Sequence, residues 1–154
     1  MTSWIRLLHT SNSAVLPVAR VGLALVILPH GLQKTLGWFG GFGFGATMDF
    51  LTGTMGIPYM LGLAAVAAES LGAILLLIGL GTRLWAAMIG VTMLVAMVTV
   101  HLQHGFFMNW FGTQAGEGAE FFLLAIALSA ALVIGGGGPL SLDRRVTCWS
   151  RAVG

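Results

Sequence analysis

Pairs of ionisable residues at helical spacing interrupt an otherwise apolar sequence. The pairs are His30–Lys34, His101–His104 and Glu117–Glu120. Residues three or four positions apart lie on one face of a helix, so each pair presents two polar groups together. A further carboxyl, that of Glu69, lies in the mostly small and apolar run AAESLGA. Imidazole, ammonium and carboxyl groups in such positions can donate hydrogen bonds and exchange protons, which is general acid–base chemistry.

The composition indicates which solvent surrounds these groups. The chain has 154 residues, of which 57% are hydrophobic and 8% are charged, whereas a soluble domain has about 25% charged residues. A soluble core of this size cannot bury so much apolar surface, so we expect the lipid bilayer to be the solvent. The net charge of +2 is too small and too dispersed for nucleic-acid binding. The single cysteine, Cys148, excludes an internal disulfide.

Four segments are apolar over the length of about 20 residues that a helix needs to cross the hydrocarbon core. These segments are residues 15–37, 58–80, 82–104 and 116–137. We therefore predict an all-α membrane protein, a four-helix bundle that forms a single integral membrane domain over residues 1–154. The first segment is expected to remain a membrane helix, because no small-residue cleavage site follows it. The segment 39–57, rich in glycine and aromatic residues, predicts a short interfacial helix around residues 46–55.

The distribution of basic residues predicts the orientation. With four spans, both termini face the same side of the membrane, and six of the seven basic residues fall on that side. These six are Arg6, Arg20, Arg83, Arg144, Arg145 and Arg151. By the positive-inside rule, the N- and C-termini are cytoplasmic. We expect an integral, multi-pass protein of the bacterial cytoplasmic (inner) membrane, with the loops around 38–57 and 105–115 on the outer side.

The polar residues are predicted to form one pocket that opens to the outer face. All three pairs lie toward the outer ends of their spans, whereas Glu69 lies near the midplane, where a carboxyl must be paired, protonated or in a cavity. We expect His101 and Glu120 to approach each other across adjacent helices. The predicted proton-exchanging, catalytic residues are Glu69, His101 and Glu120. The predicted cofactor-binding residues are His30, Lys34, Trp38, His104 and Trp110.

Other interpretations of the same residues stay open. Lys34 is equally explained as a lysine whose side chain extends to the membrane interface. Arg20 is better explained by a structural role than by catalysis, either extending to the cytoplasmic headgroups or forming an ion pair with Glu69. His104 and Glu117 are equally explained as hydrated boundary residues. The histidines and glutamates resemble four-helix-bundle metal sites in residue type, but those sites use Glu-x-x-His within one helix. A metal such as zinc at this cluster is therefore the less favoured alternative, and we assign no metal ligands.

The order and spacing of several motifs resemble the DoxX family over roughly residues 15–145. They include R-x-G at Arg20, HG-x-x-K at His30, a mid-span Glu69 before Gly72, and LLLIGLGTR at residues 75–83. They continue with His101, His104-Gly105, Glu120 and GPLSLD at residues 138–143. The resemblance implies a four-helix integral membrane protein related to the small subunits of a thiosulfate:quinone oxidoreductase. It also implies a link to membrane oxidoreductase complexes, in a family whose functions are mixed.

Two functions follow as hypotheses. The first is a subunit of a quinone-linked oxidoreductase system, with quinone as the cofactor, protons supplied by the chain, and electrons from a partner redox protein or a small reductant. The second is a non-enzymatic anchor or assembly subunit for a partner redox enzyme, in which the buried polar residues only fix helix packing. A metal-binding protein and a small-molecule transporter are less favoured. The chain could also form a homo-oligomer.

Overall fold

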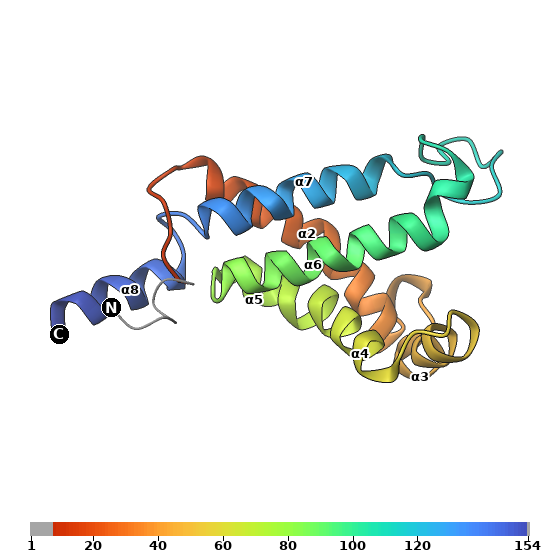
Figure 1. Cartoon of the computed structure of the whole chain (residues 1–154), viewed down its shortest axis with the longest axis horizontal. Helices are drawn as coiled ribbons and strands as arrows, with labels where there is room; N and C mark the ends of the chain where they lie inside the picture. The colour runs from red at the N-terminus through yellow and green to blue at the C-terminus, as the bar shows by residue number, and fades with distance from the viewer. Residues whose placement is uncertain (1–7, 154) are drawn as a thin grey trace.

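The computed structural model describes residues 8–153, and its side chains as far as Trp149. Within those limits the secondary structure is helical, with no strand, as predicted. Figure 1 shows the helices lying roughly along one long axis, with α8 continuing beyond one end of the bundle. Arg6, one of the basic residues predicted to face the cytoplasm, lies outside the described residues.

Three helices are long and apolar enough to cross a membrane, and they coincide with the first three predicted spans. They run over Val15–Leu36, Tyr59–Ile78 and Thr82–His104. The first is α2 (Val15–Leu36). The second consists of α4 (Tyr59–Ala67), the π-helical turn η3 (Ala68–Gly72) and α5 (Ala73–Ile78). The third consists of α6 (Thr82–Ala96), the π-helical turn η4 (Met97–His101) and the short 3-10 turn η5 (Leu102–His104).

The fourth predicted span is shorter than expected. Helix α7 (Glu120–Gly135) has 16 residues, and residues 116–119 belong to the preceding loop instead. Ala119 and Glu120 donate backbone hydrogen bonds to the carbonyls of Gly105 and Phe106, at 3.1 and 2.9 Å. These bonds fold the loop back onto the end of α6 before α7 begins. Helix α7 is apolar and packs along α6 (Figure 1).

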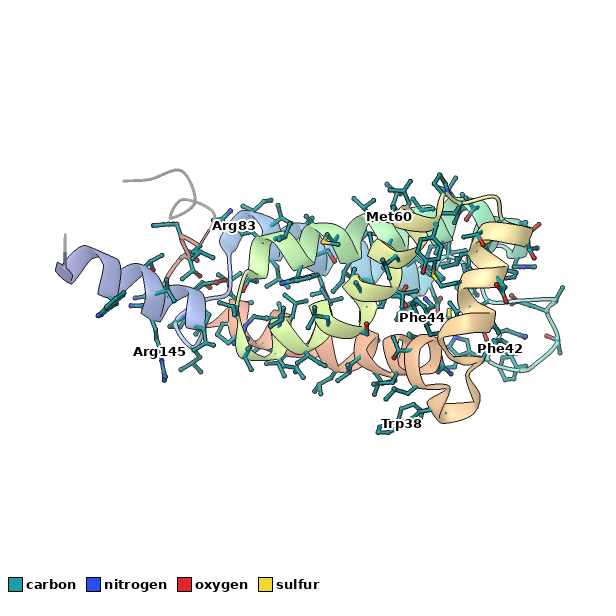
Figure 2. The ribbon with its side chains drawn as sticks, turned by 90° about the horizontal axis from the view of Figure 1, so that it is seen from below. Trp38, Phe42, Phe44, Met60, Arg83 and Arg145 are labelled. Atoms are coloured by element: carbon teal, nitrogen blue, oxygen red, sulfur yellow. The ribbon has the colours of Figure 1, made fainter. Side chains whose placement is uncertain are left out.

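The short helix between the first two spans is confirmed. Helix α3 (Gly43–Asp49) continues into the π-helical turn η2 (Phe50–Thr54), so it begins three residues before the predicted start. Figure 2 shows this element running across the long axis of the bundle, near Phe42 and Phe44. Thr47 and Met48 are buried, whereas Phe42 is 86% exposed. An element with this orientation and one apolar exposed edge suits a membrane interface.

Residues from both ends of the chain hold the turn between α5 and α6. The buried guanidinium of Arg20 donates to the carbonyls of Leu76, Leu77 and Leu140, the last two at 2.7 and 3.0 Å. The Asp143 carboxylate accepts from the backbone N–H groups of residues 81 and 82 at 2.7 and 2.9 Å. Helix ends leave such groups without partners. Arg20 therefore completes the end of α5, and Asp143 completes the start of α6.

Basic residues gather at this same end of the bundle. Arg20, Arg83 and the first turn of α8 (Leu142–Val153), which carries Arg144 and Arg145, all lie there. Figure 2 shows Arg83 and Arg145 at the end opposite to Trp38 and Phe42. This clustering agrees with the predicted charge asymmetry, and the cytoplasmic orientation of the termini stays a prediction.

Candidate functional site

Lys34 and Glu69 form an ion pair between α2 and the second spanning helix. The Lys34 Nζ donates to Glu69 Oε2. The side chain of Glu69 is 1% exposed, whereas that of Lys34 is 37% exposed. Since Glu69 lies about 15 Å along its helix from Tyr59, its carboxylate is inside an apolar span and needs a partner. Lys34 supplies that partner and still reaches the surface of the bundle.

A close helix crossing makes this pair possible. A Cβ at Gly31 would lie 2.2 Å from the Glu69 carbonyl oxygen and 2.6 Å from the Ser70 Cα, so only glycine permits this approach. Glu69 itself lies in the π-helical turn η3. Such turns add one residue to an α-helix and often occur at functional sites. The HG-x-x-K motif thus combines a contact residue, Gly31, with the lysine that reaches across one turn later.

His30 lies beside Gly31 on an exposed part of α2. Its ring faces Phe121 of α7, with the ring centres 5.7 Å apart. Phe121 contacts Phe122 at 5.2 Å, and Phe122 in turn contacts the ring of His101 at 4.1 Å. The two phenylalanines therefore separate the two histidines, and connect them through a continuous row of aromatic rings.

The predicted approach of His101 to Glu120 is replaced by other partners. The Nδ1 of His101 lies 2.9 Å from the carbonyl oxygen of Glu117, so this nitrogen donates and the carbonyl fixes the ring tautomer. Glu120 Oε1 accepts from the indole Nε1 of Trp110 at 3.3 Å. His101 and Glu120 have these partners because α7 begins later than predicted. The loop before α7 folds back onto residues 105 and 106, just after η5, and provides both partners.

The loop between α6 and α7 is closed by the side-chain amide of Asn109, which binds the backbone of Gln114. The Asn109 side chain accepts from the backbone N–H of Gln114 at 3.0 Å and donates to its carbonyl at 3.1 Å. The carboxylate of Glu117 accepts from the Asn109 N–H at 2.7 Å. These bonds hold a small ring of chain that presents Trp110 and Phe111, which are 77% and 90% exposed. The sequence analysis did not identify this role for Asn109 and Gln114.

The sequence-predicted site residues therefore fall into an inner and an outer group. Lys34 and Glu69 form the inner group, with His30 nearby on α2. The outer group consists of His101, His104, Trp110, Glu117 and Glu120 at the loop between α6 and α7. The ring of His104 packs closely on Gly116, where an added Cβ would lie 2.6 Å from the His104 Nε2. Trp38 joins neither group, since Figure 2 shows it pointing away from the bundle.

The structure bears on two alternatives, the Arg20–Glu69 ion pair and the metal site. Arg20 binds backbone carbonyls rather than Glu69, so the alternative in which Arg20 forms an ion pair with Glu69 is wrong. Within residues 8–153, no three His, Cys, Asp or Glu side chains converge as metal ligands would. The phenylalanine pair Phe121–Phe122 was also missed, although its position directly after Glu120 was the available signal.

Residues 15–102 match the model of the DoxX family, a match that includes α2, the second spanning helix with Glu69, and the third as far as His101. The chain is 31% identical over 124 residues to the "Putative oxidoreductase CatD" of Bacillus subtilis (strain 168), an alignment that covers 80% of this chain and 81% of that protein. No solved structure matches the chain. With the family match spanning more than half of its residues, this helical membrane protein belongs to the DoxX family.

Proposed function

We propose that the chain is the integral membrane subunit of a quinone-linked oxidoreductase system in the bacterial cytoplasmic membrane. The observation that supports this most directly is the Lys34–Glu69 ion pair inside apolar spans. Ionisable residues at such depth are costly and are typical of proton relays and ligand sites. The name of the Bacillus subtilis relative, an oxidoreductase, agrees with redox chemistry.

The chain offers hydrogen-bond donors that fit a quinone carbonyl. An ammonium group has three N–H donors, and Glu69 accepts one of those of Lys34. Because Lys34 is 37% exposed, its other donors can reach a ligand at the surface of the bundle. His30 lies one turn earlier on α2 and is exposed, so it can donate to the same ligand. A bound quinone would accept electrons and protons there.

Glu69 is placed to hold the proton that this reaction needs. Its carboxylate contacts the Lys34 ammonium, so a proton can move between the two groups over a single hydrogen bond. His101 and Glu120 lie at the outer loop and are half-buried, where protons exchange with water.

Electrons come from outside the chain in this proposal. The donor is a redox partner protein or a small reductant. The exposed aromatic residues of the outer loop are available to such a partner protein, and lipid covers the apolar helix faces.

Quinone content and quinone binding test the proposal. The chain is purified in mild detergent, bound quinone is extracted and quantified, and binding of decylubiquinone is then titrated. We expect saturable binding that Glu69→Gln and Lys34→Gln weaken strongly. His30→Ala should weaken it too, and since His30 is exposed, this variant should fold. Asp49→Asn, an exposed carboxyl on α3, is the matched control and should bind as the wild type does. No quinone and no saturable binding in the wild type would reject the proposal.

The outer loop favours a second candidate function, that of an anchor for a partner enzyme. Trp110 and Phe111 are highly exposed on a loop that Asn109 and Gln114 hold rigid, and rigid aromatic anchors are typical of protein interfaces. In this case Trp110→Ser with Phe111→Ser would release the quinone-reducing activity from the membrane fraction, whereas Glu69→Gln would leave it in place. If the loop variant keeps the activity in the membrane fraction and Glu69→Gln abolishes it, the quinone site is supported instead.

A further inference from the structure

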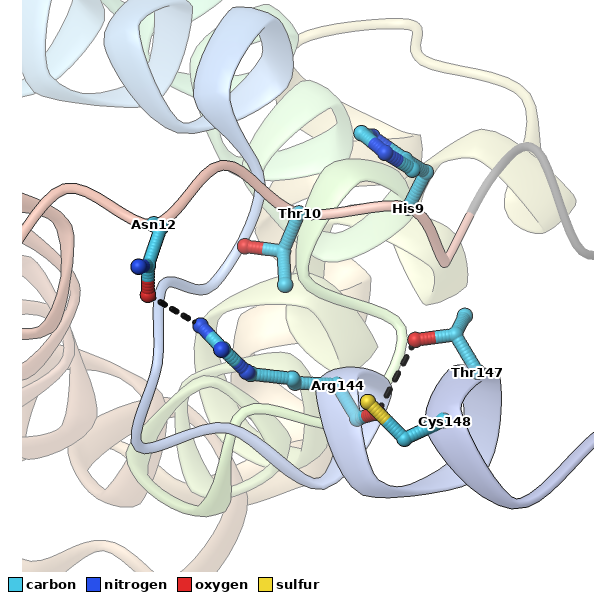
Figure 3. A pocket seen from close by; sticks show the side chains of 6 residues that line it. All are labelled: His9, Thr10, Asn12, Arg144, Thr147 and Cys148. Carbon is cyan, nitrogen blue, oxygen red and sulfur yellow. Dashed lines mark hydrogen bonds between the residues drawn. The ribbon is translucent and has the colours of Figure 1, made fainter. Parts of the chain in front are cut away.

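The end of the bundle that bears the arginines contains a pocket between residues 9–12 and the start of α8. Its lining residues are His9, Thr10, Asn12, Arg144, Thr147 and Cys148. Figure 3 shows the N-terminal segment on one side and α8 on the other, with the Arg144 side chain extending along the hollow. The cavity volume of about 190 Å³ is room for several water molecules, and hence for a phosphate group. We call it the inner pocket.

Both walls of the inner pocket are fixed to the bundle. On the N-terminal side, Ser11 N–H donates to the Gly135 carbonyl at 2.9 Å, and the Arg83 Nε donates to the His9 carbonyl at 3.1 Å. On the other side, Asp143 binds the start of α6 through its carboxylate and the Gly79 carbonyl through its N–H, at 2.9 Å. The pocket therefore keeps its shape without a ligand, which lowers the entropic cost of binding.

The lining of the inner pocket has the chemistry of an anion site. None of its six residues is acidic, and Arg144 provides a guanidinium with five N–H donors. One of these donors contacts the Asn12 side-chain oxygen, which orients the group and leaves its other donors for an anion. His9 adds an exposed imidazole to the lining, whereas the hydroxyls of Thr10 and Thr147 donate to backbone carbonyls. The neighbouring carboxylate of Asp143 is 1% exposed, and both of its oxygens are bound to backbone N–H groups.

We propose that the inner pocket binds a phosphate group, with Arg144 as its main ligand. Planar guanidinium groups bind phosphate oxygens strongly because two parallel N–H donors match them. Asn12 lies three residues before α2 begins at Val15, so the pocket lies at the depth of lipid headgroups if α2 spans the membrane. The phosphate of an anionic phospholipid and free inorganic phosphate share this chemistry, and the experiment below distinguishes them.

Cys148 allows the occupancy of the pocket to be measured directly. It is the single cysteine of the chain, its side chain is exposed, and it lines the pocket beside Thr147 (Figure 3). A ligand bound to Arg144 would shield its thiol from a neutral maleimide. The rate of alkylation therefore reports binding, and it does so independently of any redox activity.

The test compares alkylation rates in three environments without other oxyanions. These are nanodiscs of phosphatidylcholine alone, nanodiscs that also contain phosphatidylglycerol, and detergent with increasing inorganic phosphate at constant ionic strength. We expect phosphatidylglycerol to slow the alkylation of Cys148 severalfold. If inorganic phosphate in detergent slows it equally, the site takes free phosphate as well. If only the lipid does so, the headgroup is the ligand.

The adjacent arginines supply a matched control. Arg145 is exposed and points away from the bundle (Figure 2), so Arg145→Ala removes the same charge from the same helix without touching the pocket. We expect Arg144→Ala to abolish the protection and Arg145→Ala to retain it. Equal loss in both variants would show a general surface-charge effect and would overturn the proposal. It would also be overturned if neither phosphate source slows the alkylation of the wild type, a result that needs no variant to fold.

Discussion

Lys34 of α2 and Glu69 of η3 form an ion pair in which the lysine is partly exposed and the carboxylate is fully buried. The two residues are 35 positions apart in the sequence. Each is on a helix of which most other residues are apolar. The pair therefore links α2 to the second spanning helix beside their close crossing at Gly31, whatever reaction the site performs.

Removal of one partner should destabilise the protein more than removal of both. We expect Lys34→Met to lower the free energy of unfolding by about 3 kcal/mol, because it leaves the Glu69 carboxylate buried without a partner. Lys34→Met combined with Glu69→Gln should recover part of this loss. Thermal unfolding of the wild type, Lys34→Met, Glu69→Gln and the double variant in one detergent gives the double-mutant cycle. Strictly additive effects would show that the two side chains do not interact.

The crossing at Gly31 gives a second prediction. Gly31→Ala places a methyl group 2.2 Å from the Glu69 carbonyl oxygen, so the helices must move apart. We expect a loss of about 1–3 kcal/mol, as for other overpacked positions, together with weakened ion pairing. Gly22→Ala on the same helix is the control, because no atom lies within 4 Å of its Cβ position. Comparable melting temperatures for the two variants would contradict the observed crossing.

Asp143 should act as the N-terminal cap of α6, although it lies 61 residues after Thr82. Asp143→Ala leaves two N–H groups without their acceptor, and we expect a cost of about 1–2 kcal/mol, the range for capping residues. Asp143→Asn should keep part of the stability, since an amide oxygen can accept one of these bonds. Asp49→Ala, which changes an exposed carboxyl, serves as the reference in the same unfolding experiment.

The amide-closed loop between α6 and α7 should resist proteolysis. Asn109→Ala removes both hydrogen bonds to Gln114, so we expect chymotrypsin to cleave after Trp110 or Phe111 severalfold faster. Gln103→Ala, which changes an exposed amide outside the loop, should leave the rate unchanged. Fragment masses over a digestion time course identify the cleavage site. Equal rates for wild type and Asn109→Ala would show that the amide contacts do not restrain the loop.

The orientation in the membrane can be tested with the native cysteine. If the termini are cytoplasmic, a membrane-impermeant maleimide should label Cys148 only after the cells are permeabilised. The converse control is Cys148→Ser with Thr113→Cys in the outer loop, which should be labelled in intact cells. Labelling of Cys148 in intact cells would reverse the predicted orientation.

Helix positions follow from the sequence to the extent that length and hydropathy determine them. The first three spans agree with the prediction, because each has about 20 apolar residues between turn signals. The start of α7 was predicted four residues too early, since Glu117 and Glu120 have helical spacing and the residues around Glu117 are small. Backbone bonds to Gly105 and Phe106 keep residues 116–119 in the loop, and such tertiary contacts leave no local signal.

The candidate site was predictable in residue type but not in pairing. Burial depth identified Lys34 and Glu69 as candidates, whereas their contact depends on helix rotation and on the close approach at Gly31. Arg20 shows the same limit. Its buried charge was recognised, but its partners are carbonyl groups, and every residue carries a carbonyl, so the sequence cannot distinguish them.

The binding of Arg20 and Asp143 to one turn has a consequence for biogenesis. Asp143 accepts from the N–H groups of the α5–α6 turn, and the Leu140 carbonyl accepts from Arg20, which itself binds the end of α5. The ribosome adds Leu140 and Asp143 about 60 residues after the turn itself. Until then, the helix ends that surround this turn depend on water or on insertion factors. A chain that stops before residue 140 could insert its first spans but could not complete this junction.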